Sequence, residues 1–385
     1  MKQRHTQNAP LLPVAVSLVA GIVAGRYWAM VEQYSLTALV ASVVATLLLH
    51  RWHRWQTAGI WLCTALVGLH LSCHEISMPE PSLVQHARQH MLQVRSKLTT
   101  QYHDAGLDGE AYAIISAMTL GDRSALSPSL RSAYNETGAG HVLALSGLHL
   151  GIIYWIVTFL TVGRHWRFVS QVVTILCIWA YSFLTGLSPS IVRSAIMLTV
   201  YALMNIGYRR QASVNVLAFT AIVMLIVTPS AVFDISFQMS FLAVFSILLF
   251  YPLLYELVPQ PLLQRQPVLR YLWTTMVLSV SAQIGVAPLI AYYFHRFTTY
   301  FLLANFIVIP EAYLILVGAL LLLVSGSSII VSALATTALT AGSLLSAIAR
   351  LPGASVSPLH PTVLQVALVY VIVGCLYVIG SRLKD

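Results

Sequence analysis

Residues 299–324 read T-Y-F-L-L-A-N-F-I-V-I-P-E-A-Y-L-I-L-V-G-A-L-L-L-L-V. Glu311 is the only charged residue among them, and a membrane-spanning helix needs about 20 mostly apolar residues. The stretch is therefore long enough to cross a bilayer. Pro310 beside Glu311 leaves a second option open, a half-span or re-entrant segment whose irregular backbone is buried in protein.

Similar apolar segments extend from this stretch toward both ends of the chain. Together with it they give twelve predicted spans, near residues 11–25, 35–49, 57–73, 141–162, 168–186, 190–206, 213–229, 235–257, 271–293, 299–324, 328–348 and 362–380. The first two are short, and the sixth is short and carries a charge, so half-spans are open there too. We expect an all-α, polytopic membrane bundle of about 10 to 12 spans, including re-entrant or broken helices.

The composition agrees with this class. Of the 385 residues, 58% are hydrophobic and only 9% are charged, whereas soluble domains carry about 25% charged residues. An ordinary soluble enzyme is therefore excluded. The net charge of +9 has two interpretations, a nucleic-acid partner or the excess of lysine and arginine that membrane proteins keep in the cytoplasm.

The positions of the basic residues favour the second interpretation. With the N-terminus inside, twelve of the 21 basic residues fall at cytoplasmic ends and three in short outer loops, Arg26, Arg296 and Arg350. Both termini are therefore expected in the cytoplasm. The long outer loop, residues 74–139, is slightly negative, with seven acidic and five basic residues. The electrostatic argument for a nucleic-acid partner then rests on Arg193, the one basic residue inside a span.

The long outer loop contains two predicted helices. In the first, apolar side chains recur at steps of three and four, at Val84, Ala87, Met91, Val94 and Leu98, which indicates an amphipathic helix on the outer leaflet or over the bundle. In the second, Ser127 is the expected cap and Pro128 the first helical residue, and the helix ends before Gly138.

The densest polar cluster in an apolar setting is G-A-G-H-V-L-A-L-S-G-L-H-L-G, residues 138–151, with His141, Ser146 and His149. One interpretation is an intramembrane hydrolase in which His149 activates Ser146. Their spacing does not assure a hydrogen bond between them, and no nearby carboxylate would orient either ring. The favoured interpretation is hydrogen bonding between helices around a packed or wet cavity, with no catalytic residue.

Arg193 lies in a second cluster, G-L-S-P-S-I-V-R-S-A-I-M, residues 186–197. A charge at membrane depth costs ~3 kcal/mol on insertion scales, so it is kept where it faces a cavity or a partner. Pro189 breaks the helix just before it. Two interpretations of Arg193 stay open. It lines an aqueous path and meets phosphates, or its side chain reaches up to the outer interface.

A third cluster, F-D-I-S-F-Q-M-S-F-L-A-V-F, covers residues 233–245. It places Asp234 and Gln238 on one helical face and three aromatic rings, Phe237, Phe241 and Phe245, on another. Such rings usually face lipid or pack in a core, and the other interpretation is a stacking platform for single-stranded bases.

The fourth cluster combines Gln283 with Asn305, in spans that contain Pro288 and Pro310. Amides next to helix-breaking prolines indicate irregular backbone inside the bundle. No glycine-rich run precedes a lysine anywhere in the chain, which excludes a Walker-type ATPase. No metal-nuclease signature is found either, and we expect no metal site and no cofactor.

Five stretches, taken in order, resemble the ComEC family of competence proteins, the inner-membrane DNA-uptake channels of naturally transformable bacteria. They are L-G-D-R-S (120–124), H-V-L-A-L-S-G-L-H-L-G (141–151), T-G-L-S-P-S-I-V-R-S-A-I-M (185–197), F-Q-M-S-F-L-A-V-F (237–245), and A-Q-I-G-V-A-P-L (282–289) through N-F-I-V-I-P (305–310). The resemblance covers about residues 110 to 315.

The resemblance implies that single-stranded DNA passes inward through this bundle, with energy from other proteins. It makes His141, Ser146, His149, Arg193 and Gln238 candidates for lining or shaping the path. It also implies a separate DNA receptor, nuclease and cytoplasmic motor as partners, besides membrane lipid, and a homodimer is open.

Full-length relatives commonly carry an oligonucleotide-binding barrel and a metallo-β-lactamase-like domain. Residues 74–110 are too few for that barrel, and the chain stops at Asp385 after its last span. We therefore expect a minimal member of the family without nuclease activity.

The expected regions are an N-terminal membrane part (1–73), the outer loop (74–139), a channel core (140–325) and C-terminal hydrophobic helices (326–385). The expected function is translocation of single-stranded DNA across the bacterial inner membrane during transformation. Two alternatives stay open, the intramembrane serine hydrolase and a transporter of a smaller anionic solute.

Overall fold

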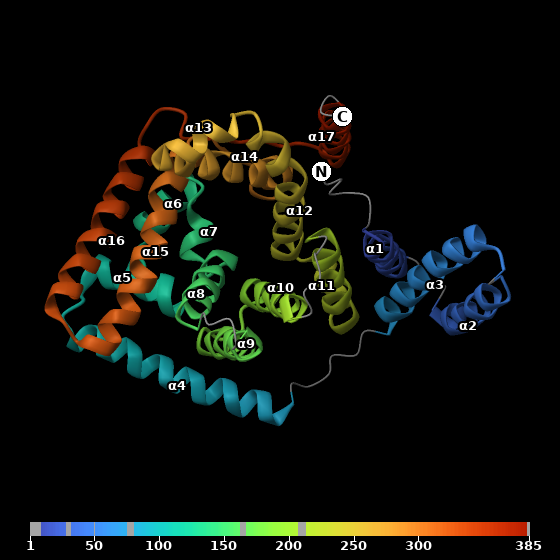
Figure 1. Cartoon of the computed structure of the whole chain (residues 1–385), viewed down its shortest axis with the longest axis horizontal. Coiled ribbons are helices and arrows are strands. Elements are labelled where there is room, and N and C mark those ends of the chain that lie inside the picture. Colours follow the sequence, from blue (N-terminus) through green and yellow to red (C-terminus); the bar gives the residue numbers. More distant parts are fainter. Residues whose placement is uncertain are drawn as a thin grey trace. The chain divides into compact units, whose positions relative to one another are not determined.

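The computed structural model describes residues 9–27, 32–49, 51–74, 81–161, 167–206 and 213–382. Helices dominate these residues (Figure 1). Within them the only strands are β1 (Phe297–Thr298) and β2 (Ser355–Val356), which pair antiparallel with Phe297 opposite Val356. The expected all-α class is confirmed.

Helices occupy the twelve predicted segments. Six are long and apolar enough to cross a bilayer: α3 (His53–Cys73), α12 (Ile235–Tyr255), α14 (Pro267–Phe294), α15 (Phe301–Ser325), α16 (Ser328–Ala349) and α17 (Val363–Arg382). Six further apolar helices are shorter: α1 (Leu11–Tyr27), α2 (Glu32–Leu48), α8 (Gly147–Leu160), α9 (Arg167–Leu184), α10 (Pro189–Ile206) and α11 (Ser213–Val227). Many of their large apolar side chains are exposed, for example Phe159 at 67% and Val324 at 89%, as expected of surfaces that face lipid.

Two of the predicted spans need comment: the fourth is interrupted, and the tenth is unbroken despite its proline. The fourth is interrupted, because α7 (Gly140–Leu143) ends and α8 begins only at Gly147. The tenth, in contrast, is a single helix of 25 residues that continues through Pro310. Packing of α15 against α5, α14 and α16 holds the helix together where the proline removes one hydrogen bond.

The helices form two compact units, each built from two stretches of the chain. The first comprises residues 1–80 and 199–241. In it α1 packs against α3 and α11, and Leu18, Ile22 and Leu225 form a core with residues around η3 (Pro229–Phe233). Gly21 lies directly against the backbone of Ala65, so a glycine is required for this close approach of two helices.

The second unit comprises residues 81–198 and 242–385 and contains most of the candidate site residues. Its main core lies between α5 (Gly109–Leu120), α6 (Pro128–Glu136), α15 and α16. α4 (Ser82–Asp104) packs against α5 and α9, and the short α13 (Gln260–Arg265) precedes α14.

Both helices predicted in the outer loop are present. α4 covers the apolar stripe, and Leu98 packs against the main core of the second unit. α6 begins as predicted, because Ser127 Oγ accepts the backbone N–H of Leu130 at 3.3 Å and Pro128 is the first helical residue. It ends at Glu136, before Gly138 with its φ of +81°.

Candidate functional site

The break between α7 and α8 is made by Ser146, which is the N-cap of α8. Its backbone is extended (φ −129°, ψ 176°), and its Oγ accepts the backbone N–H of Leu148 at 3.3 Å. A side-chain oxygen that accepts from the first turn stabilises a helix start. The chain therefore restarts a helix here within an apolar run.

His149 completes this cap from within the helix. Its Nδ1 lies 3.3 Å from the backbone nitrogen and 3.3 Å from the Oγ of Ser146. Because the backbone N–H can only donate, Nδ1 is the accepting nitrogen and the proton resides on Nε2. The ring is fully buried, and Nε2 has no hydrogen-bond partner among the described residues.

This arrangement is a capping box with histidine at its third helical position. The predicted pair is thus brought together, but Nδ1 is shared with a backbone amide. A hydrolase of the serine–histidine type also needs a group that orients the ring from its other nitrogen. Within the described chain no hydrogen bond reaches that nitrogen, Nε2.

His141 lies in α7 and its side chain is exposed. Its Nδ1 donates to the backbone oxygen of Gly138 at 2.9 Å. That bond ties the ring to the turn that follows α6.

Gly121 brings the end of α5 against the break. It adopts the left-handed conformation (φ +74°), which favours glycine. A Cβ atom at this position would lie 2.6 Å from Leu145 Cδ1 and 3.8 Å from the backbone oxygen of Thr185. The L-G-D-R-S stretch therefore packs against the H-V-L-A-L-S-G stretch and lies next to the end of α9.

The start of α8 in turn approaches α10. A Cβ atom at Gly147 would lie 2.9 Å from Ser194 Oγ, and Leu145, Leu150 and Ile191 share one small core. Three of the five stretches that carry the family resemblance thus meet in the second unit. In the sequence these stretches are separate clusters, and only the fold brings them together.

Arg193 is next to this contact and is only 2% exposed. It lies in the first turns of α10, which begins at Pro189. The turn before that helix has positive φ at Gly186 (+84°) and at Leu187 (+56°), where glycine removes a steric cost that leucine retains. With so little exposed surface, the Arg193 side chain is held inside the unit rather than extended along its surface.

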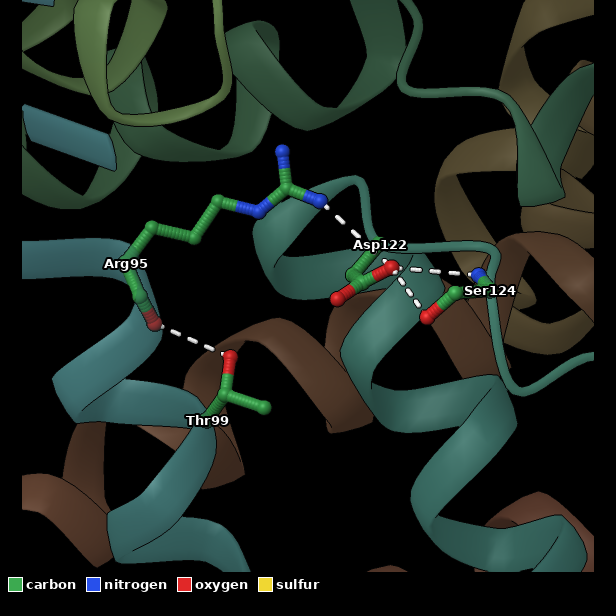
Figure 2. Close-up of polar contacts among 4 residues, drawn as sticks. All are labelled: Arg95, Thr99, Asp122 and Ser124. Atoms are coloured by element: carbon green, nitrogen blue, oxygen red, sulfur yellow. Dashed lines mark hydrogen bonds and ion pairs between the residues drawn. The ribbon is translucent and has the colours of Figure 1, made fainter. Parts of the chain in front are cut away.

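Asp122 connects the same region to α4 (Figure 2). Its Oδ1 accepts the backbone N–H of Ser124 at 3.1 Å and the Ser124 hydroxyl at 2.7 Å, and it lies 3.6 Å from Arg95 Nη2. Partial burial alone would raise its pKa, but the hydrogen bonds from Ser124 and the charge of Arg95 hold the pKa of Asp122 below its usual range. The carboxylate therefore stays ionised and fixes the loop against α4.

Gln283 and Asn305 belong to a polar seam between α14 and α15. Asn305 Nδ2 donates to Ser279 Oγ at 3.0 Å, and Ser246 Oγ of α12 donates to the backbone oxygen of Ser281 at 2.6 Å. Gln283 Nε2 and Asn305 Oδ1 are buried without a hydrogen-bond partner among the described residues. Orphaned amide atoms of this kind suit a place that water or a polar solute enters.

The residues of the 233–245 cluster have local structural contacts. Asp234 Oδ1 accepts the backbone N–H of Ser236 at 3.1 Å, and Gln238 Nε2 donates to the backbone oxygen of Val232 at 2.9 Å. Phe237 is only 5% exposed and lies in the core of the first unit, with its ring centroid 4.3 Å from that of Phe241.

Phe245 falls in the second unit, in the same helix, α12, and is partly buried. The three rings therefore do not share one compact unit. The proposed stacking role stays a prediction.

Glu311, the charged residue beside Pro310 in the tenth predicted span, has a partner far away in the sequence. It is 2% exposed, and Tyr134 donates its hydroxyl to Glu311 Oε1 at 3.1 Å. Burial and the adjacent Glu311 carboxyl raise the pKa of Tyr134 above its ordinary value, so the phenol remains a donor. A lone acid in the most apolar stretch was the signal, but its partner is 177 positions away.

The part of the chain that the structure describes contains no group of three or more histidine, cysteine, aspartate or glutamate residues that could hold a metal ion.

These features define the class of the protein. Apolar helices of spanning length, with buried polar side chains gathered at helix breaks, make it a multi-pass membrane protein. A family profile described as "Competence protein" matches residues 118–383, more than half of the chain, and the chain belongs to this family. No solved structure matches it.

Curated relatives match over part of their length. The chain is 30% identical over 218 residues to ComE operon protein 3 of Bacillus subtilis, covering 55% of this chain and 26% of that protein. It is 25% identical over 221 residues to Recombination protein 2 of Haemophilus influenzae, covering 54% of this chain and 28% of that protein. An uncharacterized protein of Aquifex aeolicus is 32% identical over 158 residues, which are 40% of this chain and 37% of that protein. The chain thus spans well under half of these relatives.

Proposed function

We propose that this chain takes part in DNA uptake during natural transformation, as the membrane channel through which single-stranded DNA enters the cytoplasm. Membership of the competence protein family supports the role in uptake. The channel role is supported by one observation above the others. Gly147, the residue after the capped break at Ser146, contacts Ser194 of α10, and the buried Arg193 is the residue before Ser194 in that helix.

The chemistry of this junction suits a flexible polyanion. A guanidinium kept inside an apolar bundle can meet phosphates, which it binds through a planar fork of N–H donors. The orphaned amide atoms of Gln283 and Asn305 add polar groups without adding charge. A transported DNA strand must also be released, and a conducting site must not bind it too tightly. A path with few, separated contacts meets this requirement.

The membrane and the orientation are part of the proposal. We assign the protein to the bacterial inner membrane with both termini in the cytoplasm, on the positive-inside distribution of its basic residues. The β1–β2 pair joins the loop after α14 to the loop after α16. The first loop carries Arg296 and the second carries Arg350, and this topology assigns both arginines to the outer side.

The proposed partners are single-stranded DNA, membrane lipid, and separate proteins that capture DNA, degrade the second strand and drive transport. A second copy of the chain is a further proposed partner. Since no glycine-rich phosphate loop precedes a lysine in the sequence, the energy for transport is assigned to another protein.

The test is deletion of the gene in a transformable host, with labelled DNA measured separately in the outer compartment and in the cytoplasm. We expect outer DNA to remain and cytoplasmic DNA to fall to background, and expression of the chain to restore it. Unchanged cytoplasmic DNA would exclude the channel. Normal DNA entry together with loss of uptake of a small organic anion would instead favour the transporter of a smaller solute.

A further inference from the structure

Three arginines from two distant parts of the chain line one surface hollow of about 560 Å³ in the second unit. Arg123 lies in the loop after α5, Arg131 in α6, and Arg296 between α14 and β1. Ser124, Ser132 and Asn135 also line the hollow and add neutral hydrogen-bonding groups. Five donors on each guanidinium make such a set suited to oxyanions.

No carboxylate within the described residues forms an ion pair with any of the three arginines. Burial and the positive charge of Arg131 lower the pKa of the Arg123 guanidinium, so these two like charges are held near each other at a cost. Both remain charged, because arginine does not lose its proton in proteins. An anion between them would relieve the repulsion.

A second hollow of about 540 Å³ adjoins the first through the shared residue Arg296. Phe294 and His295 line it, and Phe294 is 47% exposed. Glu136 lies at this hollow, and its Oε1 accepts the hydroxyl of Ser132 at 2.7 Å. An anion pocket beside exposed aromatic rings has the two elements that bind single-stranded nucleic acid, backbone charge and base stacking.

We propose that the hollow formed by Arg123, Arg131 and Arg296 binds a backbone phosphate of single-stranded DNA, with a neighbouring base against Phe294 and His295. The proposal rests on the proposed function, and it adds the place where the strand first docks. By the expected topology all three arginines are on the outer side. It also revises the inference that Arg193 alone carries the electrostatic argument, because net charge over a loop does not reveal local clustering.

The test measures binding of a fluorescent 20-nucleotide oligothymidylate to the full chain in nanodiscs of phosphatidylcholine. Arg123→Gln with Arg131→Gln should weaken binding about ten-fold, since two charge-assisted contacts to one phosphate are lost. The salt dependence should fall by about 0.7 in the slope of log affinity against log salt, the value for one phosphate of a single strand. Arg123→Lys with Arg131→Lys should keep that slope.

The matched control is Arg350→Gln, an exposed arginine at the end of α16 that does not line the hollow. Its affinity should stay within about two-fold of the unchanged chain, as for an exposed charge that makes no phosphate contact. Unchanged oligothymidylate affinity in the double glutamine variant, or an equal loss of affinity in the control, would overturn the assignment of the hollow. So would an unchanged salt slope.

Two further arms distinguish the source of the phosphate. Millimolar inorganic phosphate should leave oligothymidylate bound, and displacement by it would indicate a site for a small anion instead. Replacing phosphatidylcholine by phosphatidylglycerol should weaken binding in all variants alike. If phosphatidylglycerol weakened oligothymidylate binding only in the chain with intact arginines, the hollow would be a lipid headgroup site, and the assignment to DNA would be overturned.

The outcome is separable from that of the deletion experiment. If deletion abolishes cytoplasmic DNA but the double glutamine variant binds oligothymidylate normally, the channel stands and the pocket fails. If deletion leaves cytoplasmic DNA unchanged, the channel fails whatever the oligonucleotide binding shows.

Discussion

The side chain of Ser146 separates a structural role from a catalytic one. As an N-cap it should contribute about 1 kcal/mol, so Ser146→Ala should lower the thermal stability of the purified chain while leaving DNA uptake within about two-fold. Ser146→Thr keeps the hydroxyl and the cap and serves as the control. Complete loss of uptake in Ser146→Ala, at normal stability, would favour the serine hydrolase.

The carboxylate of Asp122 predicts a pH dependence of stability. Because its pKa in the folded chain is below its usual range, its contribution is present above the unfolded pKa of about 4 and is lost as pH falls through the lower folded value. Asp122→Asn should therefore be less stable than the unchanged chain at pH 6, by up to about 1 kcal/mol for a partly exposed ion pair.

The difference should shrink as the pH falls below the unfolded pKa and disappear below the lower folded pKa, where the carboxyl group is protonated in both states. Thermal unfolding of the two purified chains in detergent, compared at each pH, checks this, since other titrating groups cancel between them. A difference that grows as the pH falls would contradict the contacts to Arg95 and Ser124.

At the scale of elements, the close approach of α5 to the helix break makes a graded prediction. Gly121→Ala should destabilise the chain most, because it adds strain at positive φ and a clash with Leu145. Gly109 has a φ of +61° but open space around it, so Gly109→Ala should carry the strain alone. Gly151 lies inside α8 with nothing within 4 Å, and Gly151→Ala should stabilise by up to about 1 kcal/mol.

Melting temperatures in detergent should therefore rise in the order Gly121→Ala, Gly109→Ala, unchanged chain, Gly151→Ala. If the variants at 121 and 109 were equally destabilised, the packing of the L-G-D-R-S stretch against the break would be excluded. The rank does not depend on knowing the absolute stability.

The positions of the helices are largely predictable from the sequence, whereas the helix breaks and the contacts between helices are not. Apolar runs located the twelve helical segments, because lipid requires an apolar composition of every helix that it contacts. The break before Ser146 was hidden, since its cap lies among apolar residues. Pro310 suggested a break that packing prevents. Arg123 and Arg296 are far apart in the sequence, and only the fold places them in one hollow.

For the whole molecule, the β1–β2 pair predicts which loops share a side of the membrane. His295 Nδ1 also donates to the backbone oxygen of Leu359 at 3.0 Å, which joins the same two loops. Ser124 lines the same hollow as Arg296, which lies in the first of these loops. In a chain without its native cysteines, Ser355→Cys and Ser124→Cys should therefore both react with an impermeant maleimide added to intact spheroplasts. Arg265→Cys, at the end of α13, should react only after lysis.

Reaction at position 355 but not at 124 would contradict the shared side, and so would reaction of Arg265→Cys from outside. The native cysteines to be removed are Cys63, Cys73, Cys177 and Cys375, none of which forms a disulfide.

The central claim is that DNA passes the junction of Ser146 and Arg193, and charge at position 193 tests it most directly. Labelled DNA reaching the cytoplasm is measured in deletion strains that carry Arg193→Lys, Arg193→Met, Arg193→Glu or, as control, Arg350→Glu, at matched protein levels in the membrane. We predict that lysine retains most uptake, methionine loses about ten-fold and glutamate abolishes entry, because the loss follows charge rather than volume. Uptake that is equal in the methionine, glutamate and control strains would contradict the account.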